Sequence, residues 1–360
     1  DERALGIIPP TGEPKATDNI DEIIVMITTL IDKGFAYQGA SGDVYYSVAK
    51  FEGYGKLSGR NIEDLRAGDR IAVNTDKNDP LDFVLWKMSK PDEPNWDSPW
   101  GIGRPGWHIE CSAMATKILG NHFDIHGGGH DLQFPHHENE IAQSEACTGE
   151  HFANYWMHNG FIRIDEEKMS KSLGNFFTIK EVLGKYKAEE IRYFMLTSQY
   201  RSPLNYSTDQ LDAAGASLDR LYTAMRGVDI GVAPQDTQYE SHFIEAMDDD
   251  FNTPEALAAL FDLAREINRT TEASEASNLA ALLLKLANQL GLMEASIEAW
   301  FKGDGDAGGL SDDAIDVLIQ QRIDAKANKD WATADKIRDD LQAQGVSLED
   351  NGAETIWRRG

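Results

Sequence analysis

The chain has 360 residues, of which 41% are apolar and 26% are charged, as is usual for a globular protein. This length exceeds what one hydrophobic core usually supports and indicates about two to four domains. The formal net charge of −27 excludes a general polyanion binder, so nucleic acid would have to bind through local basic patches. No apolar run approaches the roughly 18 residues of a membrane-spanning helix. Because two cysteines are too few for a disulfide framework, we expect a cytoplasmic protein.

The amino-terminal part is predicted to form a small α+β module over residues 1–102. The chain starts Asp1-Glu2-Arg3-Ala4, with no initiator Met and no basic-then-apolar leader, and we interpret it as part of a longer protein. Isoleucine and leucine residues at helical spacing predict a helix over 18–33 that ends before Gly34. Short apolar runs predict strands at 35–37, 44–46 and 83–86.

Residues 103–206 have a different pattern, in which helices alternate with short apolar strands. Glycines and Pro105 predict a loop at 101–106, and Gly120 ends a predicted helix at 108–119. Further along, we predict a strand at 123–125, a glycine loop at 126–129, a helix from Pro135 to about Cys147 and a strand at 155–157. This alternation is typical of a parallel α/β sheet.

The rest of the chain is predicted to be mainly helical. Residues 207–302 contain three leucine-rich helical patterns, and Thr253-Pro254 is a favourable N-cap and first-turn pair, so we predict an all-α bundle. A glycine-rich linker at 303–310 precedes a module over 311–360. This module is predicted to contain two helices and two strands joined by a turn at Asn351-Gly352.

Three residues have the types and spacing of a metal site. His136 and Glu140 share one face of a predicted helix, and Cys111 lies near the start of another, where the helix dipole favours a thiolate. Two alternatives remain open on spacing alone: Cys111 as a core residue, and His137 and Glu138 as the solvated face of the helix. Three ligands would also leave the coordination shell one short, unless water or substrate fills it. Cys147 has no partner pattern, and we interpret it as structural.

A second set of residues is suited to polyphosphate. The run Lys168-Met169-Ser170-Lys171-Ser172-Leu173-Gly174-Asn175 combines ammonium groups, hydroxyls and a flexible glycine. A near copy, Lys87-Met88-Ser89-Lys90, lacks the continuation, and we interpret it as a chance match at the end of a strand. The predicted loop 126–129 is followed by Asp131, which could accept hydrogen bonds from ribose hydroxyls. A glycine-rich turn without a ligand is the alternative there.

Together these segments resemble the cysteinyl-tRNA synthetases, a family of class I aminoacyl-tRNA synthetases. The resemblance rests on the Lys168–Asn175 run, which resembles the KMSKS signature, on Gly106–Met114, on Phe134–Glu140 and on the ending Trp357-Arg358-Arg359. It covers essentially the whole chain. It implies an α/β fold: the C-terminal half of a class I Rossmann-type catalytic domain with an α+β insertion, then an all-α bundle and a small α+β C-terminal module.

The resemblance also implies an activity and its site residues. The enzyme would activate L-cysteine with Mg²⁺-bound ATP and transfer it to tRNA(Cys). One Zn²⁺ per subunit would be held by Cys111, His136, Glu140 and a further cysteine, and would select the cysteine thiolate. Trp107 and His126 would line the cysteine pocket; Gly129, Asp131, Met169, Ser170, Lys171 and Ser172 would bind ATP; Lys168 and Lys171 would stabilise the transition state. The tRNA contacts would be Trp331, Asp335, Arg338, Asp350, Trp357, Arg358 and Arg359. We expect a monomer that makes no membrane contact.

The sequence departs from the family pattern in two respects. It contains neither a His-x-Gly-His segment, which is the first class I signature, nor the fourth zinc ligand. We therefore expect these 360 residues alone to bind zinc weakly and to form no adenylate, which cysteine-dependent pyrophosphate exchange would test. Two rival functions remain: a cysteine ligase that acts on an amino-sugar acceptor, and a non-catalytic tRNA-binding or regulatory fragment.

Overall fold

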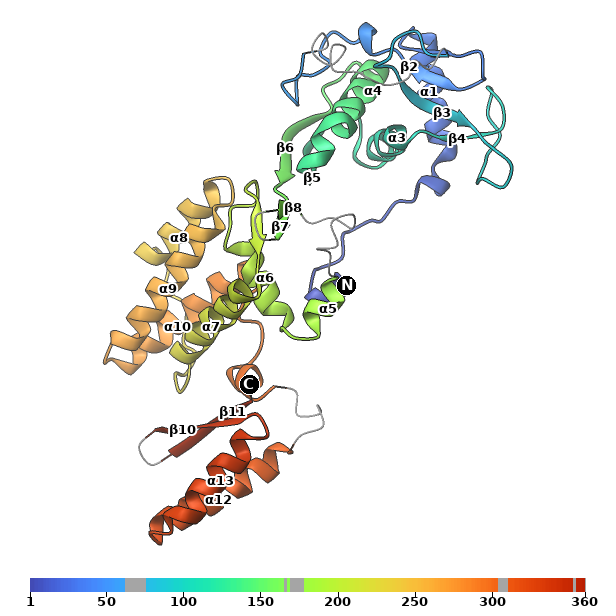
Figure 1. Ribbon diagram of the computed structural model, residues 1–360. Coiled ribbons are helices and arrows are strands. Elements are labelled where there is room, and N and C mark those ends of the chain that lie inside the picture. Colours follow the sequence, from blue (N-terminus) through green and yellow to red (C-terminus); the bar gives the residue numbers. More distant parts are fainter. Residues whose placement is uncertain (62–75, 165–166, 169–177, 304–309, 352–353, 360) are drawn as a thin grey trace. The chain divides into compact units, whose positions relative to one another are not determined.

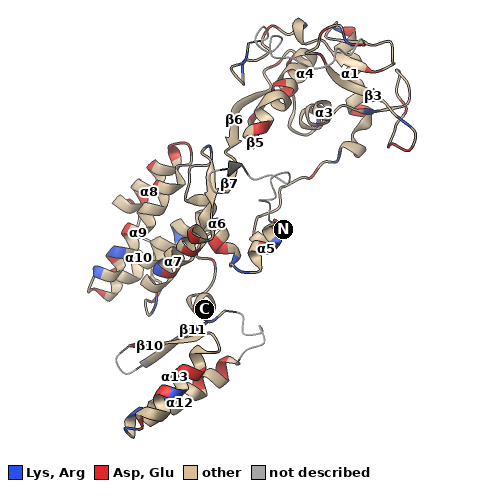
Figure 2. Cartoon of the chain, in the orientation of Figure 1, with Lys and Arg blue, Asp and Glu red and all other residues tan. Residues whose placement is uncertain are grey.

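A computed structural model of the chain describes residues 1–61, 76–164, 167–168, 178–303, 310–351 and 354–359 (Figure 1). The chain divides into two compact units. The parallel-sheet unit consists of Ile8–Ser170 and Tyr200–Asn205, and the helical unit of Asp1–Ile7, Lys171–Gln199 and Tyr206–Gly360. Among the described residues, no helix is both long and apolar enough to span a membrane. Acidic residues occur on the helices of both units (Figure 2).

The first part of the parallel-sheet unit has the predicted helix and strands. Helix α1 spans Ile20–Asp32, and the strands β1, β2 and β3 span Ala36–Gln38, Val44–Tyr46 and Phe83–Met88. Together with β4 (Gly103–Pro105) they form an antiparallel sheet in the order β1-β2-β3-β4. Buried α1 residues such as Ile23 and Ile27 pack in one core with Trp86 of β3. Cys147 lies at the edge of this core, which agrees with a structural role.

The predicted loop at 101–106 is wrong in its middle, because Gly103–Pro105 is a strand. Pro105 pairs with Trp86 at the edge of the sheet, where a residue without an N–H group is tolerated. A Cβ atom on Gly103 would lie 2.3 Å from Trp86 Nε1 and 2.5 Å from Lys87 O. Glycine is therefore required by the close approach of β3, although glycine and proline suggest a loop when read from sequence.

The near copy of the lysine motif lies within this sheet. Lys87 forms an ion pair with the buried carboxylate of Asp43, and Met88 N donates to Asp43 Oδ1 at 2.8 Å. Both residues belong to β3. These contacts hold Lys87 and Met88 in the antiparallel sheet. This agrees with the interpretation of the near copy as the end of a strand.

The second part of the unit contains the parallel strands. Helix α3 spans Trp107–Leu119 and helix α4 spans Glu138–Thr148. Strands β5 (Phe123–Gly129) and β6 (Ala153–Asn159) pair in parallel, from Phe123 opposite Ala153 to Gly129 opposite Asn159. Short helical turns at His130–Leu132 and Gln133–His137 connect β5 to α4. A further small sheet has the order β8-β7-β9, with strands Glu167–Lys168, Ile162–Ile164 and Leu204–Tyr206.

The predicted glycine loop at 126–129 is also wrong, because these residues continue β5. Each of the three glycines pairs with a residue of β6. A Cβ atom on Gly128 would lie 2.9 Å from His137 Cε1 and 3.0 Å from Leu132 Cδ1. The glycines therefore serve a close approach between β5 and the segment that leads into α4, a known use of glycine in strands.

Helix α4 is held by the α+β module through polar contacts. Tyr46 Oη donates to Ala142 O at 2.8 Å, and Tyr54 Oη donates to Asn139 Oδ1 at 2.6 Å. The carboxylate of Glu138 accepts hydrogen bonds from Ser58. The module therefore fixes the helix whose amino-terminal turn carries His136 and Glu140.

The helical unit contains the predicted bundle. Its helices are α7 (Thr208–Ala224), α8 (Gln238–Asp248), α9 (Thr253–Arg269), α10 (Ala273–Gln289) and the short α11 (Ile297–Lys302). Two preceding helices, α5 (Ile179–Leu183) and α6 (Ala188–Leu196), are not predicted from the sequence. Asn252, one residue before the predicted Thr253, occupies the N-cap of α9.

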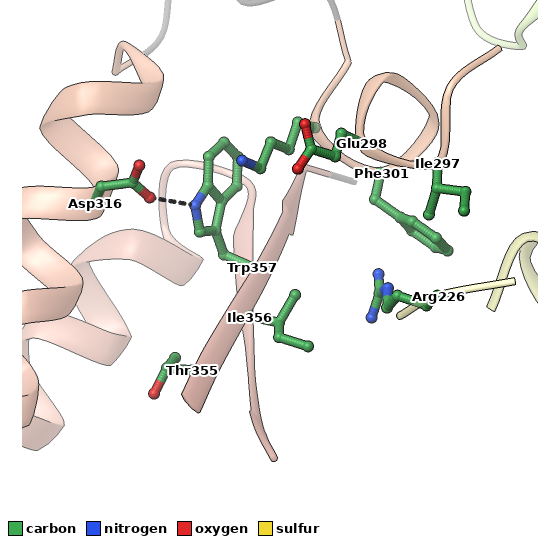
Figure 3. Close-up of a pocket in the computed structure, with 9 residues that line it drawn as sticks. Arg226, Ile297, Glu298, Phe301, Asp316, Thr355, Ile356 and Trp357 are labelled. Carbon is green, nitrogen blue, oxygen red and sulfur yellow. Dashed lines mark hydrogen bonds between the residues drawn. The ribbon is translucent and has the colours of Figure 1, made fainter. Parts of the chain in front are cut away.

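The C-terminal module has the predicted helices and strands. Helices α12 (Asp312–Ala327) and α13 (Trp331–Gln342) pack on the antiparallel strands β10 (Val346–Asn351) and β11 (Glu354–Arg359). Trp357 of β11 is only 4% exposed, and its Nε1 donates to Asp316 Oδ1 at 2.7 Å (Figure 3). It lines a cavity of about 260 Å³ together with Phe301 of α11 and Arg226. Most of the predicted linker (304–309) and Gly352 of the predicted turn lie outside the described residues.

Candidate metal centre and substrate site

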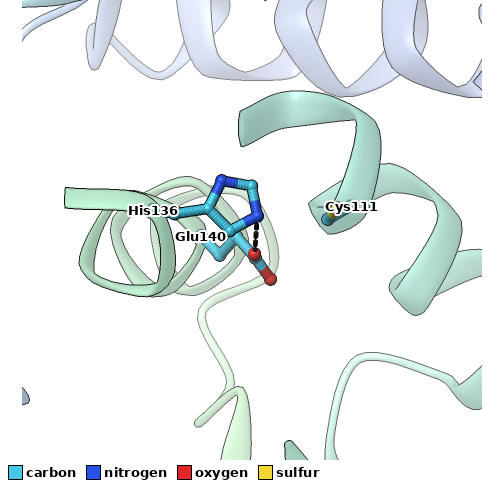
Figure 4. A group of neighbouring side chains, drawn as sticks. All are labelled: Cys111, His136 and Glu140. Atoms are coloured by element: carbon cyan, nitrogen blue, oxygen red, sulfur yellow. Dashed lines mark ion pairs between the residues drawn. The ribbon is translucent and has the colours of Figure 1, made fainter. Parts of the chain in front are cut away.

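The three predicted metal ligands lie together in the parallel-sheet unit (Figure 4). Cys111 comes from α3, His136 from the turn before α4, and Glu140 from the first turn of α4. One ligand atom from each residue lies within 4.8 Å of the other two. His136 Nε2 is 2.6 Å from Glu140 Oε1, as the i, i+4 spacing on a helix allows.

Glu140 is a buried carboxylate with imidazoles on both sides. Its side chain is 1% exposed, with His136 at Oε1 and His126 Nε2 at 2.6 Å from Oε2. Burial raises the pKa of Glu140, but the contacts with His126 and His136 outweigh this effect and lower its pKa to about 2. The group therefore carries a negative charge at neutral pH, as a ligand for a divalent cation must.

In the protein without a metal ion, other influences outweigh any effect of the helix dipole on the Cys111 thiol. Burial, and then the carboxylates of Glu140 and Glu110, raise the pKa of Cys111 to about 12. A divalent cation among these ligands would reverse this effect, because a coordinated thiol loses its proton. The thiol, imidazole and carboxylate donors fit zinc, and three protein ligands leave a position for a substrate atom.

An outer histidine supports the ligand His136. His108 Nδ1 lies 2.8 Å from His136 Nδ1, so one of these nitrogens donates to the other. Burial, followed by repulsion from His136, lowers the pKa of His108 to about 4, so His108 is neutral at pH 7. With a cation bound, a proton on His136 Nδ1 would let His136 Nε2 coordinate the ion in place of its contact with Glu140 Oε1, which is the usual arrangement of a histidine ligand.

The predicted cysteine-pocket residues, Trp107 and His126, lie on two sides of this centre. The Trp107 ring is 59% exposed, and its centroid is 4.5 Å from that of His136. The ring of His126 lies 4.7 Å from that of Trp156 of β6. The exposed indole of Trp107 thus provides an apolar surface beside the candidate ligand His136. Contact of Trp107 and His126 with substrate cysteine stays a prediction.

A second group of potential ligands shares Glu140. Ligand atoms of His126, His137 and Glu140 also lie within 4.8 Å of one another. His137 Nδ1 is 2.8 Å from His158 Nε2, and burial lowers the pKa of His137 to about 4. The alternative that His137 and Glu138 form a solvated face is wrong, because they are 1% and 0% exposed. The adjacent pair His136-His137 was the available sequence signal for this group.

The predicted nucleotide residues lie at the carboxyl end of β5 and on the lysine loop. Asp131 is exposed in the turn directly after β5, where ligands bind in parallel sheets. A Cβ atom on Gly129 would lie 2.5 Å from Asp131 Oδ1, so a side chain there would require the Asp131 carboxylate to move. Lys168 belongs to β8, but its side chain lies outside the described residues, as do Met169, Ser170, Lys171 and Ser172. Their roles stay predictions.

Three predicted tRNA contacts form a stripe on α13. Trp331, Asp335 and Arg338 follow the i, i+4, i+7 spacing of one helix face, and Trp331 is 61% exposed. Arg338 forms ion pairs with Asp335 at 3.1 Å and Asp339 at 2.9 Å. An exposed indole beside polar groups is suited to stacking on an unpaired base.

The other residues predicted to contact tRNA bind other residues of this chain through their side chains. Asp350 accepts hydrogen bonds from Arg322, Lys326 and Thr355, which hold its pKa well below the usual range. Trp357 is buried, as described above. Arg359 donates to the backbone carbonyls of Lys302 at 2.6 Å and Leu310 at 2.8 Å, whereas Arg358 has only longer ion pairs, with Glu349 at 3.5 Å and Asp219 at 3.9 Å. These contacts favour structural roles for Trp357 and Arg359, and contact with tRNA stays a prediction.

Comparison with known proteins gives matches that cover the whole of this chain. A cysteine–tRNA ligase of Methylococcus capsulatus is 61% identical, over all of this chain and 79% of that protein. A cysteine–tRNA ligase of Thioalkalivibrio sulfidiphilus is 63% identical, also over all of this chain and 79% of that protein. The chain belongs to the cysteine–tRNA ligase family. This confirms the resemblance inferred from Gly106–Met114, Phe134–Glu140 and the lysine run.

Three domain families match successive parts of the chain. Residues 1–216 match the class I (C) tRNA synthetase catalytic domain, 242–294 a DALR domain, and 309–358 a cysteinyl-tRNA ligase anticodon binding domain. In fold, the chain is similar to Mycobacterium tuberculosis methionyl-tRNA synthetase in complex with methionyl-adenylate. That match has a TM-score of 0.50 and 12% identity, and covers 80% of this chain and 74% of that one. The predicted fold class, a class I synthetase catalytic region followed by helical domains, is confirmed.

Proposed function

We propose that this chain is the part of a cysteine–tRNA ligase that recognises cysteine and tRNA(Cys). The observation that carries the proposal is the convergence of Cys111, His136 and Glu140 within 4.8 Å, in a chain that matches cysteine–tRNA ligases over its full length. The match of residues 309–358 to an anticodon binding domain supports tRNA, and not an amino sugar, as the acceptor. A cytoplasmic location and a monomeric state are further predictions.

Cys111, His136 and Glu140 would hold Zn²⁺, with one coordination position left for the substrate. When bound, zinc would favour the thiolate of cysteine over the hydroxyl of serine, because a thiolate is the better ligand for this cation. Selectivity then comes from ligand chemistry, and the pocket does not have to distinguish two side chains of similar size. Trp107 would exclude water from one side of the bound cysteine, and His126 would lie on the other side.

The reaction has two steps. In the first, the cysteine carboxylate attacks the α-phosphate of Mg²⁺-bound ATP, and pyrophosphate leaves. In the second, a terminal ribose hydroxyl of tRNA(Cys) attacks the carbonyl carbon of cysteinyl-adenylate, and AMP leaves. Both steps depend mainly on positioning and charge stabilisation. Lys168 and Lys171 would neutralise the charge that develops on the phosphates, and Asp131 would accept hydrogen bonds from the ATP ribose.

Because the 360 residues contain no His-x-Gly-His segment, we propose that they form no cysteinyl-adenylate by themselves. Cysteine-dependent exchange of radiolabelled pyrophosphate into ATP tests this directly, with a longer protein that includes the segment as the positive control. Robust exchange by the 360 residues alone would contradict this part of the proposal. Aminoacylation of tRNA(Cys), compared with transfer to glucosamine, tests the acceptor.

A further inference from the structure

The two oxygens of Glu140 face two different histidines. Oε1 lies 2.6 Å from His136 Nε2, and Oε2 lies 2.6 Å from His126 Nε2. Glu140 is common to both ligand sets, since His136 belongs to the set with Cys111 and His126 to the set with His137. His136 and His137 are consecutive in the turn that leads into α4, and each belongs to a different set.

In both ligand sets, one histidine has an outer histidine and a tryptophan as neighbours. In each set, one histidine is held at Nδ1 by an outer histidine at 2.8 Å: His136 by His108, and His137 by His158. With a proton on Nδ1, each inner histidine would offer Nε2 to a metal ion, as is usual for a histidine that binds a metal. Each inner ring also packs beside a tryptophan, since Trp107 lies 4.5 Å from His136 and Trp156 lies 5.3 Å from His137.

We propose that His126, His137 and Glu140 form a second position for a divalent transition metal, next to the zinc set, with Glu140 as the shared carboxylate. Two imidazole nitrogens and one carboxylate oxygen suit Zn²⁺, Co²⁺, Ni²⁺ or Cu²⁺. The second position binds more weakly than the first, because it lacks a thiolate and shares its only anionic ligand. A carboxylate that bridges two ions through its two oxygens is common in two-metal sites.

One consequence rests on the proposed function. Because His126 is also expected to contact substrate cysteine, an ion at the second position competes with cysteine. Excess Zn²⁺ then inhibits cysteine activation in the complete ligase, and more cysteine relieves the inhibition. The metal count described next is independent of catalysis, so the second position can be established even if the proposed function fails.

The test is a titration of the metal-free 360-residue chain with Co²⁺ alone, followed by absorption spectroscopy and by metal analysis after equilibrium dialysis. Two equivalents of Co²⁺ bind, and only one of them produces the thiolate-to-cobalt charge-transfer band, because only one set contains Cys111. His137→Ala loses the equivalent without this band, and Cys111→Ser loses the equivalent with it. His242→Ala, at an exposed histidine on α8 in the other unit, is the matched control and keeps both equivalents.

Saturation of the wild-type chain at one Co²⁺ would overturn the proposal, and so would a second equivalent that His137→Ala leaves unchanged. If His137→Ala does not fold, His158→Ala removes only the outer partner of His137. That variant binds the second Co²⁺ about 10- to 100-fold more weakly, the usual cost of losing such a partner. An unchanged second binding constant in His158→Ala would equally overturn the proposal.

Discussion

Glu138 and Ser58 are 80 residues apart in sequence, yet the carboxylate of Glu138 accepts hydrogen bonds from both the amide and the hydroxyl of Ser58, at 2.9 and 2.8 Å. Glu138 is 0% exposed and lies two residues before Glu140 on α4. The antiparallel module thus contributes directly to the position of the helix that carries two candidate metal ligands. A buried carboxylate requires such partners, because an unpaired one is costly.

Ser58→Ala is expected to destabilise the chain. The change removes one of the donors to a buried carboxylate, which costs about 1.5–3 kcal/mol in the free energy of unfolding. Urea unfolding of the metal-free protein measures this cost. Ser274→Ala, on the exposed face of α10, is the matched control and should change stability by less than about 0.5 kcal/mol. Equal stability of the two variants would show that the Glu138–Ser58 contact contributes nothing.

Cys111→Ser is expected to impair zinc binding and cysteine selection together. Loss of an outer partner already weakens metal binding by about 10- to 100-fold, so loss of the thiolate ligand should cost more than about 100-fold. Competition with a chromophoric chelator measures the zinc affinity. In the complete ligase, the Michaelis constant for cysteine should rise and discrimination against serine should fall, with little change for ATP. An unchanged Michaelis constant for cysteine would count against the assigned role.

Asp350 should make the stability of the C-terminal module depend on pH. Its ordinary pKa is 3.8, and the hydrogen bonds from Arg322, then Lys326 and Thr355, lower it in the folded protein. A lowered pKa means that the contribution is complete above about pH 5 and is lost as the pH falls below about 4. Because solvent screens this partly exposed cluster, we expect a contribution of only about 1 kcal/mol.

Asp350→Asn tests this dependence. The difference in unfolding free energy between the wild type and this variant should shrink as the pH falls from about 6 to about 3. Asp340→Asn, at an exposed residue of α13, is the control and should show no such trend. A constant difference across the range would exclude Asp350 as the titrating group.

Replacement of the two tryptophans of the C-terminal module by alanine should have different effects. Trp331 is 61% exposed and Trp357 is 4% exposed. Trp331→Ala should weaken tRNA(Cys) binding by about 1–3 kcal/mol, the usual value of base stacking on an aromatic ring, and leave thermal stability unchanged. Trp357→Ala should destabilise the module by about 3–5 kcal/mol because it empties a core position. Filter binding and thermal unfolding of both variants separate these effects, and equal loss of stability in both would contradict the distinction.

The elements that follow from the sequence are those with a helical side-chain period or a short apolar run between turn residues. Helix α1 buries residues at helical spacing, whereas β2 and β3 follow from apolar runs. Strand β4 contains Gly103 and β5 ends in three glycines, and Gly103 and Gly128 leave space for Trp86 and His137. Such a role depends on what lies opposite in space, so no local pattern reveals it.

The candidate site also contains some residues that follow from the sequence and others that only the fold reveals. The pair His136 and Glu140 follows from helical spacing, and Cys111 joins it as the resemblance implies. The partners His108 and His158 were not predicted, because His158 comes from β6 and His108 from α3, and only the fold brings them to the adjacent pair in the turn before α4. Hydrogen bonds between distant elements have no sequence period.

Helix α4 is buried over most of its surface although its sequence, Glu-Asn-Glu-Ile-Ala-Gln-Ser-Glu-Ala-Cys-Thr, resembles that of a surface helix. Apolar packing fixes where a helix lies but allows small rotations about its own axis, because dispersion forces have little directionality. Hydrogen bonds to Glu138 and Asn139 have strict angular preferences and therefore set that rotation. The polar interior of this unit thus acts as an angular reference: it determines the direction in which the first turn of α4 presents Glu140, before any ion is bound.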